Sequence, residues 1–139
     1  MNSYATMFAS YLKEVNLQFQ TEHTEECDRI VIDDDVIEID DSSCKFLRLV
    51  TDVPPNKMDE MFRLVNRLNE EYRYVGFYIY QGNPSLLCAS YYFSIYGSEK
   101  ETSDQILKKY NIFRKSLANP GVQILWSFCF RNFRFLIKR

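Results

Sequence analysis

The chain has 139 residues, a length that can bury a sizeable core in one domain without a metal or disulfide to hold it together. Hydrophobic residues make up 46% of it and aromatic residues 16%, and the formal net charge is -2. This balance gives no general attraction to nucleic acid or anionic membranes, and no uncharged apolar run reaches the roughly 20 residues of a membrane span. We therefore expect neither nucleic acid nor a membrane as a partner.

The four cysteines stand far apart in the sequence. They form no C-x-x-C pair, and none has a histidine at the spacing of a metal site. The chain begins with no signal peptide, so we expect a cytoplasmic protein with free thiols, and a disulfide remains the alternative. These residues are Cys27, Cys44, Cys88 and Cys129.

The first predicted element is a helix. Apolar side chains recur in steps of three and four from Tyr4 to Phe19, which places one hydrophobic stripe along a helix. Ser3 is a residue type that caps helix starts. The polar and acidic run that begins near Gln20 predicts the end of the helix there.

Three short strands are predicted next. β-branched residues at 30–32 and 36–39 flank the acidic run 33–35, which predicts two strands joined by a solvated turn. Residues 46–51 predict a third strand, with Phe46 and Arg48 on the same face.

A second helix is predicted after the pair Pro54-Pro55. Asn56 can cap it, and Asp59 places negative charge at its positive end. After Tyr72 the apolar period changes from helical to two over 73–80 and 86–95. This change predicts a β-hairpin, in which Gly82 and Asn83 would tolerate the positive φ of a tight turn.

A third helix is predicted over about 102–118, with Thr102 and Gln105 as a capping box. The run Asn119-Pro120-Gly121 would end it. The aromatic, basic remainder 122–139 mixes both periods, so it is either a final helix, an added strand or a tail docked elsewhere. We expect 1–139 to form a single domain.

Several of these segments resemble the YbjN family, a bacterial family labelled sensory transduction regulator. The resemblance covers roughly residues 1–117, and the run from Ser90 to Leu107 is similar to the last strand and helix of the family. Its most specific parts are Val53-Pro54-Pro55, Asn66-Arg67-Leu68-Asn69, Tyr72-Arg73 and Phe77-Tyr78-Ile79.

The fold of that family is similar to that of type III secretion chaperones. The resemblance therefore implies an α+β domain with an antiparallel sheet and helices packed mainly on one face, in the order α-β-β-β-α-β-β-α. It implies no catalytic residues and no cofactor. It also implies a cytosolic protein that acts by contact with other proteins.

Two clusters of polar residues contain side chains of the types that bind metals. His23, the only histidine, stands among Glu22, Glu25 and Glu26, but one imidazole with surface acids rarely makes a specific site. The acidic runs 33–35 and 40–41 lack the spacing, the glycine and the closing glutamate of a calcium loop. We therefore expect no metal.

The remaining polar residues do not form a recognisable catalytic set. A Ser-His-Asp or Cys-His set would have to use His23, and no neighbouring residue marks its partner. No glycine-rich phosphate loop is present, so we expect no enzyme and no cofactor. Asn66 and Asn69 favour a structural role, in which their amides tie the helix end to the following strand.

The best candidate for a binding surface is a tyrosine-rich face of the hairpin, because tyrosine offers a large contact area with a polar tip. One of the helices or the tail could instead cover that face, and the lack of basic residues on these strands disfavours stacking on RNA. The candidate partner-binding residues are Arg48, Tyr74, Tyr78, Tyr80 and Tyr92.

We therefore expect a non-enzymatic, cytosolic protein-binding or chaperone-like regulatory module. Its partner would be a protein or peptide, and a second copy in a homodimer is one such partner. The alternative is a small-ligand-binding or toxin-neutralising protein with a pocket between helices and sheet.

Overall fold

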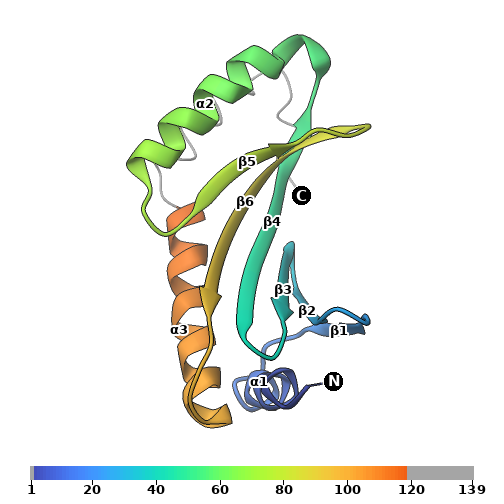
Figure 1. Cartoon of the computed structure of the whole chain (residues 1–139), viewed down its shortest axis with the longest axis vertical. Helices are drawn as coiled ribbons and strands as arrows, with labels where there is room; N and C mark the ends of the chain where they lie inside the picture. Colours follow the sequence, from blue (N-terminus) through green and yellow to red (C-terminus); the bar gives the residue numbers. More distant parts are fainter. Residues whose placement is uncertain (1, 119–139) are drawn as a thin grey trace. The chain divides into compact units, whose positions relative to one another are not determined.

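A computed structural model describes residues 2–118 of the chain (Figure 1). The sheet has six strands in the order β1-β2-β3-β4-β6-β5, and the pairings β1–β2, β2–β3, β3–β4 and β5–β6 are antiparallel. The elements are α1 (Ser3–Glu14), β1 (Gln20–His23), β2 (Asp28–Ile32), β3 (Asp35–Ile39), β4 (Ser43–Val53), the 3-10 turn η1 (Pro55–Lys57), α2 (Met58–Glu71), β5 (Gly76–Tyr80), β6 (Ser85–Ser94) and α3 (Glu99–Leu117).

The predicted α+β class and order of elements are confirmed, and the structure adds the strand β1, which the sequence analysis did not predict. The described residues form two compact units, one of 2–48 with 91–112 and one of 49–90 with 113–118. The single domain over 1–139 stays a prediction, and the segment 122–139 lies outside the described residues.

Helix α1 is shorter than predicted and has a different cap. The Asn2 side-chain oxygen accepts a hydrogen bond from the Ala5 N–H at 2.8 Å, so Asn2 caps the helix instead of Ser3. The helix ends at Glu14 because Asn16 adopts a left-handed φ of 59°, which stops helical hydrogen bonding. The chain then leaves the helical conformation, and β1 begins at Gln20.

The core of the first unit lies on one face of its strands. Burial alternates along β2 and β3, and the pairing register aligns Ile30, Ile37 and Phe46, each of which is buried. Helix α1 contributes the buried side chains Phe8 and Leu12. The Phe46 ring also packs edge-on against Phe93 and against Tyr110 of α3, with 5.4 Å between ring centroids in both pairs.

The starts of the other two helices also differ from the predictions. Asn56 lies inside η1, and α2 begins at Met58 after Lys57, which makes no side-chain capping bond. Helix α3 begins at Glu99, earlier than predicted, because the Ser98 hydroxyl accepts from the Glu101 N–H at 3.2 Å. Thr102 is not a cap there.

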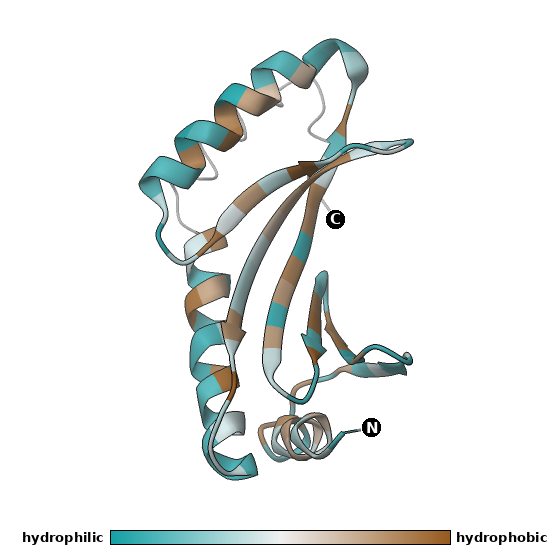
Figure 2. Ribbon diagram, in the orientation of Figure 1, coloured by the Kyte–Doolittle hydropathy of each residue, from teal (hydrophilic) through white to brown (hydrophobic). Residues whose placement is uncertain are grey.

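In the second unit, β5 and β6 form the predicted hairpin. Phe77 pairs with Ala89 and both are buried, whereas Tyr78 and Tyr80 on the other parity are exposed. Cys88 lies opposite Tyr78 yet is buried, so that face is not open along its whole length. Figure 2 shows hydrophobic bands along α2, separated by hydrophilic ones.

The hairpin turn is built differently from the prediction. Neither Gly82 nor Asn83 has a positive φ, and the Asn83–Pro84 peptide bond is cis. A Cβ at Gly82 would lie 2.6 Å from Cε1 of the Tyr80 ring, so a larger residue there would require the exposed Tyr80 side chain to shift.

Asn69 confirms the predicted tie between the end of α2 and the next strand. Its amide nitrogen donates to the Phe77 carbonyl at 2.9 Å, and its amide oxygen accepts from the Phe77 N–H at 2.8 Å. Strand β5 is the last strand of the sheet in the described part of the chain, and there this amide takes the place of a neighbouring strand at Phe77. Asn66 is exposed on α2.

Candidate partner-binding surfaces

The four predicted tyrosines are exposed, and they lie in different parts of the chain. Tyr74 precedes β5, and Tyr78 and Tyr80 lie on it, with exposed fractions of 57%, 37% and 58%. These three belong to the second unit. Tyr92 lies on β6 in the first unit and is 67% exposed. Their role in binding stays a prediction.

Arg48 is held by an internal ion pair. Its Nε and Nη2 donate to the two carboxylate oxygens of Asp35 at 2.6 and 2.8 Å, a bidentate arrangement. The Tyr110 hydroxyl donates to the same carboxylate at 2.7 Å. These bonds to Asp35 raise the pKa of Arg48, against the opposite effect of burial.

Asp35 is 1% exposed, so the prediction that the whole acidic run 33–35 is solvated was wrong for this residue. Asp33 and Asp34 are exposed in the turn, and Asp33 adopts a left-handed φ of 53°. The buried carboxylate needs a counter-charge, and Arg48 supplies it. We infer that much of the Arg48 side chain serves the fold, whatever else it contacts.

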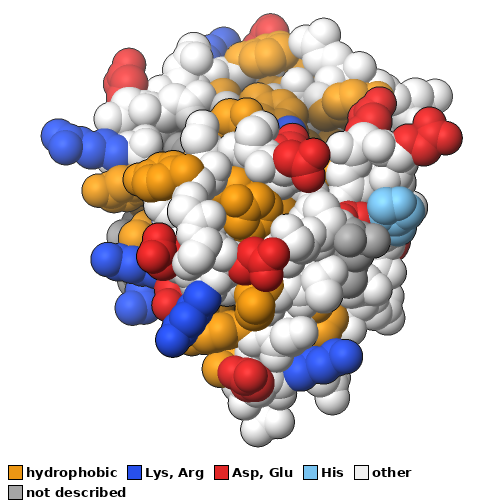
Figure 3. Space-filling model, turned by 60° about the horizontal axis from the view of Figure 1, so that its bottom comes forward, with side chains coloured by type: hydrophobic (Ala, Val, Ile, Leu, Met, Phe, Trp, Pro, Cys, Tyr) orange, Lys and Arg blue, Asp and Glu red, His pale blue; other side chains and the backbone are white. Residues whose placement is uncertain are grey.

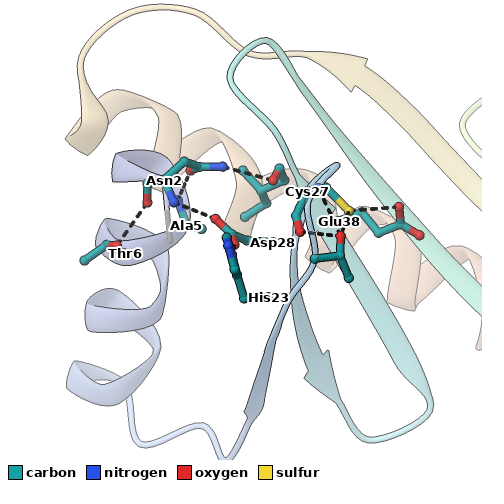
Figure 4. A network of polar contacts seen from close by, with 9 residues as sticks. Asn2, Ala5, Thr6, His23, Cys27, Asp28 and Glu38 are labelled. Carbon is teal, nitrogen blue, oxygen red and sulfur yellow. Dashed lines mark hydrogen bonds and ion pairs between the residues drawn. The ribbon is translucent and has the colours of Figure 1, made fainter.

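His23 contacts a buried carboxylate. Its Nδ1 lies within hydrogen-bonding distance of Asp28, which is 2% exposed (Figure 4). The Asn2 backbone N–H donates to the other Asp28 oxygen at 2.5 Å, and the Asn2 amide donates to the Ile39 carbonyl at 3.0 Å. Asp28 thereby fastens the β1–β2 hairpin to the start of α1.

The ionisation of Asp28 follows from these contacts. Burial by itself would raise the pKa of Asp28, but the hydrogen bonds from His23 and Asn2 outweigh it and hold that pKa below its ordinary value. Within residues 2–118, no three side chains of His, Cys, Asp or Glu are grouped so that they could hold a metal ion.

Strand β1 offers an edge that the sequence analysis missed. All four of its residues are exposed, and among residues 2–118 its only strand partner is β2. The Thr24 N–H donates to the Cys27 carbonyl at 3.0 Å, so Thr24 and Cys27 are a hydrogen-bonded pair. Because such pairs alternate in an antiparallel ladder, the backbone groups of Glu22 face β2, and those of Thr21 and His23 face outward.

An open hollow of about 830 Å³ lies beside this edge. The face that carries α1 and this hollow also carries the Thr21 side chain, because Thr21 pairs with the buried Ile30. Figure 3 views the molecule from the side of α1 and shows hydrophobic, acidic and basic side chains intermingled on that face. The hollow is lined by residues of α1, of the connection to β1 and of the first two strands: Ala9, Lys13, Leu17, Phe19, Thr21 and Val31 among them.

In the part of the chain that the structure describes, no helix is both long and apolar enough to cross a membrane. The sequence matches the YbjN family, described as "Putative bacterial sensory transduction regulator", over residues 5–108. The chain belongs to the YbjN family. This confirms the resemblance seen in the sequence.

A solved structure has a similar fold. The crystal structure of YbjN from E. coli aligns with a TM-score of 0.55 at 11% identity, over 81% of this chain and 87% of that chain. This similarity shows that the two share a fold. No curated protein matches the sequence.

A second structure is the Yersinia pestis type III secretion chaperone SycH in complex with a fragment of YscM2. It aligns with a TM-score of 0.45 at 11% identity, over 83% of this chain and 98% of that chain. That similarity is too weak to support a conclusion about the partners of this YbjN-family chain. None of these matches favours a small-ligand-binding or toxin-neutralising protein.

Proposed function

We propose that this YbjN-family chain is a non-enzymatic, cytoplasmic regulatory module that works by binding another protein. The observation that supports the proposal is the exposure of Tyr74, Tyr78 and Tyr80 beside strand residues that are buried. Tyrosine is enriched at protein–protein interfaces, so exposed tyrosines that are close together in one strand region are candidates for a contact surface. A tyrosine ring adds apolar area while its hydroxyl keeps a hydrogen bond to water or to a partner.

The side chains of the described residues support a binding role over catalysis. The single histidine has Nδ1 committed to Asp28, where it ties two elements together. Cys44 and Cys88 are buried, and burial raises the pKa of the Cys44 thiol, which disfavours the reactive thiolate. A regulator that acts by contact needs none of these groups to react.

The proposal is tested by the native mass of the full chain and by the proteins that copurify with it. Replacement of a central interface tyrosine typically costs about 2 kcal/mol of binding, or roughly 30-fold in affinity. We expect that loss for Tyr80→Ser, with Tyr92→Ser tested in the same way. Tyr96→Ser is the matched control, because Tyr96 is 71% exposed and lies outside the predicted set.

The native mass also decides whether the partner is a second copy. A dimer that Tyr80→Ser converts to a monomer would support a homodimer through this surface. A monomer with no reproducible copurifying protein, or losses that are equal for Tyr80→Ser and the control, would contradict the proposal.

A further inference from the structure

We propose that the outer edge of β1, together with the hollow beside α1, binds an extended basic segment of a partner protein. This is a second surface, separate from the tyrosines on which the proposed function rests. The edge supplies backbone hydrogen bonds, the hollow takes apolar side chains, and the surrounding acids select positive charge. Each of these parts is present in the first unit alone.

The edge has the backbone groups that strand addition needs. The N–H and C=O of Thr21 and of His23 point away from β2, and the described residues provide them with no backbone partner. An added strand would satisfy these groups and extend the sheet, as in other cases of peptide recognition at a sheet edge. The contact of His23 with Asp28 fixes the strand before a peptide arrives, which lowers the ordering cost of binding.

The hollow decides which side chains the added strand carries toward α1. Residues directly opposite one another in a sheet share a face, so the residue opposite Thr21 projects toward the α1 side. There it meets Leu17 and Phe19, which belong to the apolar part of the lining of this hollow of about 830 Å³. Lys13, Gln18 and Asp33 belong to the polar part of the lining. Alternate residues of the partner segment are therefore apolar.

The charge around the edge sets the other positions. Glu22, Glu25 and Glu26 are all exposed. Between positions 20 and 41 the only Lys or Arg is Arg29, and its Nε faces Glu38 at 3.8 Å. A segment with lysine or arginine at the positions between its apolar residues complements this excess of negative charge.

A second copy of the chain is a poorer occupant of the edge. The antiparallel pairing of two β1 strands that uses every outward group places Thr21 opposite the His23 position of the other copy. That register sets Glu22 directly against Glu22, and like charges in opposed positions destabilise a sheet. The edge is therefore poorly suited to the β1 strand of a second copy.

The test uses the full chain and fluorescein-labelled peptides of alternating valine and lysine, with binding followed by fluorescence anisotropy. The control peptide replaces every lysine with glutamate, and we expect it to bind at least about tenfold more weakly because its charge is reversed. Two further versions of the lysine peptide carry N-methyl groups on alternate residues, one on the odd-numbered residues and the other on the even-numbered residues. Only one of these two sets of N–H groups faces β1, so one version of the peptide loses binding and the other keeps it.

Two variants assign the effect to this edge. Glu22→Lys should weaken the lysine peptide by roughly tenfold and strengthen the glutamate peptide. Its matched control, Glu70→Lys, changes an exposed acid of α2 in the second unit and should leave both peptides unchanged. Thr21→Pro removes one outward N–H without touching the ladder to β2, so it should also weaken binding.

The proposal is overturned if the lysine peptide does not bind, if both N-methylated versions bind alike, or if Glu22→Lys and Glu70→Lys have equal effects. Circular dichroism of each variant shows whether it has folded. The tyrosine variants should leave peptide binding unchanged. A failure at this edge can thus be distinguished from a failure of the proposed function, which is read from the copurifying partners.

Discussion

At the scale of single residues, two side chains supply partners that the backbone does not. Asn69 bonds to the backbone of Phe77, and Arg48 pairs with the buried Asp35 carboxylate. Asn69 provides both a donor and an acceptor to the backbone of Phe77. The sequence predicted such a tie for Asn66 and Asn69, because both lie near a helix end just before a strand, and the structure shows it for Asn69. The Asp35 site was not predicted, because Tyr110 lies 75 residues away from Asp35 and no local pattern links them.

Asn69→Ala should lower the free energy of unfolding by about 1–3 kcal/mol, because it leaves two backbone groups of Phe77 without their partner. Asn66→Ala, on the exposed side of the same helix, should change it by no more than about 0.5 kcal/mol. Urea denaturation of both variants is the measurement. Equal effects would show that the amide of Asn69 does not stabilise the strand.

Arg48→Ala should destabilise the protein by about 3 kcal/mol, because it leaves the buried Asp35 carboxylate without its counter-charge. If Asp35→Asn is added, part of that loss should return, since the neutral amide needs no counter-charge and can still accept from Tyr110. A double-mutant cycle in urea measures this coupling. Purely additive losses would mean that the ion pair contributes little.

At the scale of elements, the alternation of apolar and polar residues predicted the strands that have one buried face. It did not predict β1, because both faces of that strand are polar. Strands β2 and β3 alternate between buried and half-buried residues, and the hairpin of β5 and β6 keeps its predicted pairing. Strand β1 has no apolar residue and no buried one, so it carries no such pattern. Its strand conformation depends on its pairing with β2, which local sequence does not encode.

The buried face of β4 should be far more sensitive to truncation than its exposed face. Phe46→Ala removes a ring that packs against Phe93 and Tyr110, and we expect a loss of about 3–5 kcal/mol. Leu49→Ala, at a position on the same strand that is 45% exposed, should cost about 0.5 kcal/mol. Thermal denaturation compares the two. A larger loss of stability for Leu49→Ala than for Phe46→Ala would contradict the assignment of Phe46 to the buried face of β4.

At the scale of the whole molecule, buried acids link stability to pH. Burial alone would raise the pKa of Asp40, but the hydrogen bonds that it accepts from Ser42 and Ser43 lower it overall, as the contacts of Asp28 do for that residue. A carboxyl with a folded-state pKa below its unfolded value binds protons more readily in the unfolded chain. Its stabilisation is therefore present above about pH 4 and is lost as pH falls through the folded pKa.

We therefore expect the free energy of unfolding to decrease as the pH is lowered below about 4, and Asp28→Asn to reduce that decrease. Urea titrations from neutral to acid pH test this, with the variant and the natural chain measured side by side. A variant whose stability falls with acid as steeply as that of the natural chain would show that Asp28 does not carry the linkage.

The amide of Asn69 has a consequence for self-association. A sheet that leaves both margins available can grow without limit as each molecule pairs with the next, which is how fibrils elongate. Here one margin is occupied at Phe77 by a side chain of the same molecule, and a newcomer would have to displace it. A copy that adds at Phe77 must first break both hydrogen bonds of Asn69, so pairing of one molecule after another is disfavoured at this edge.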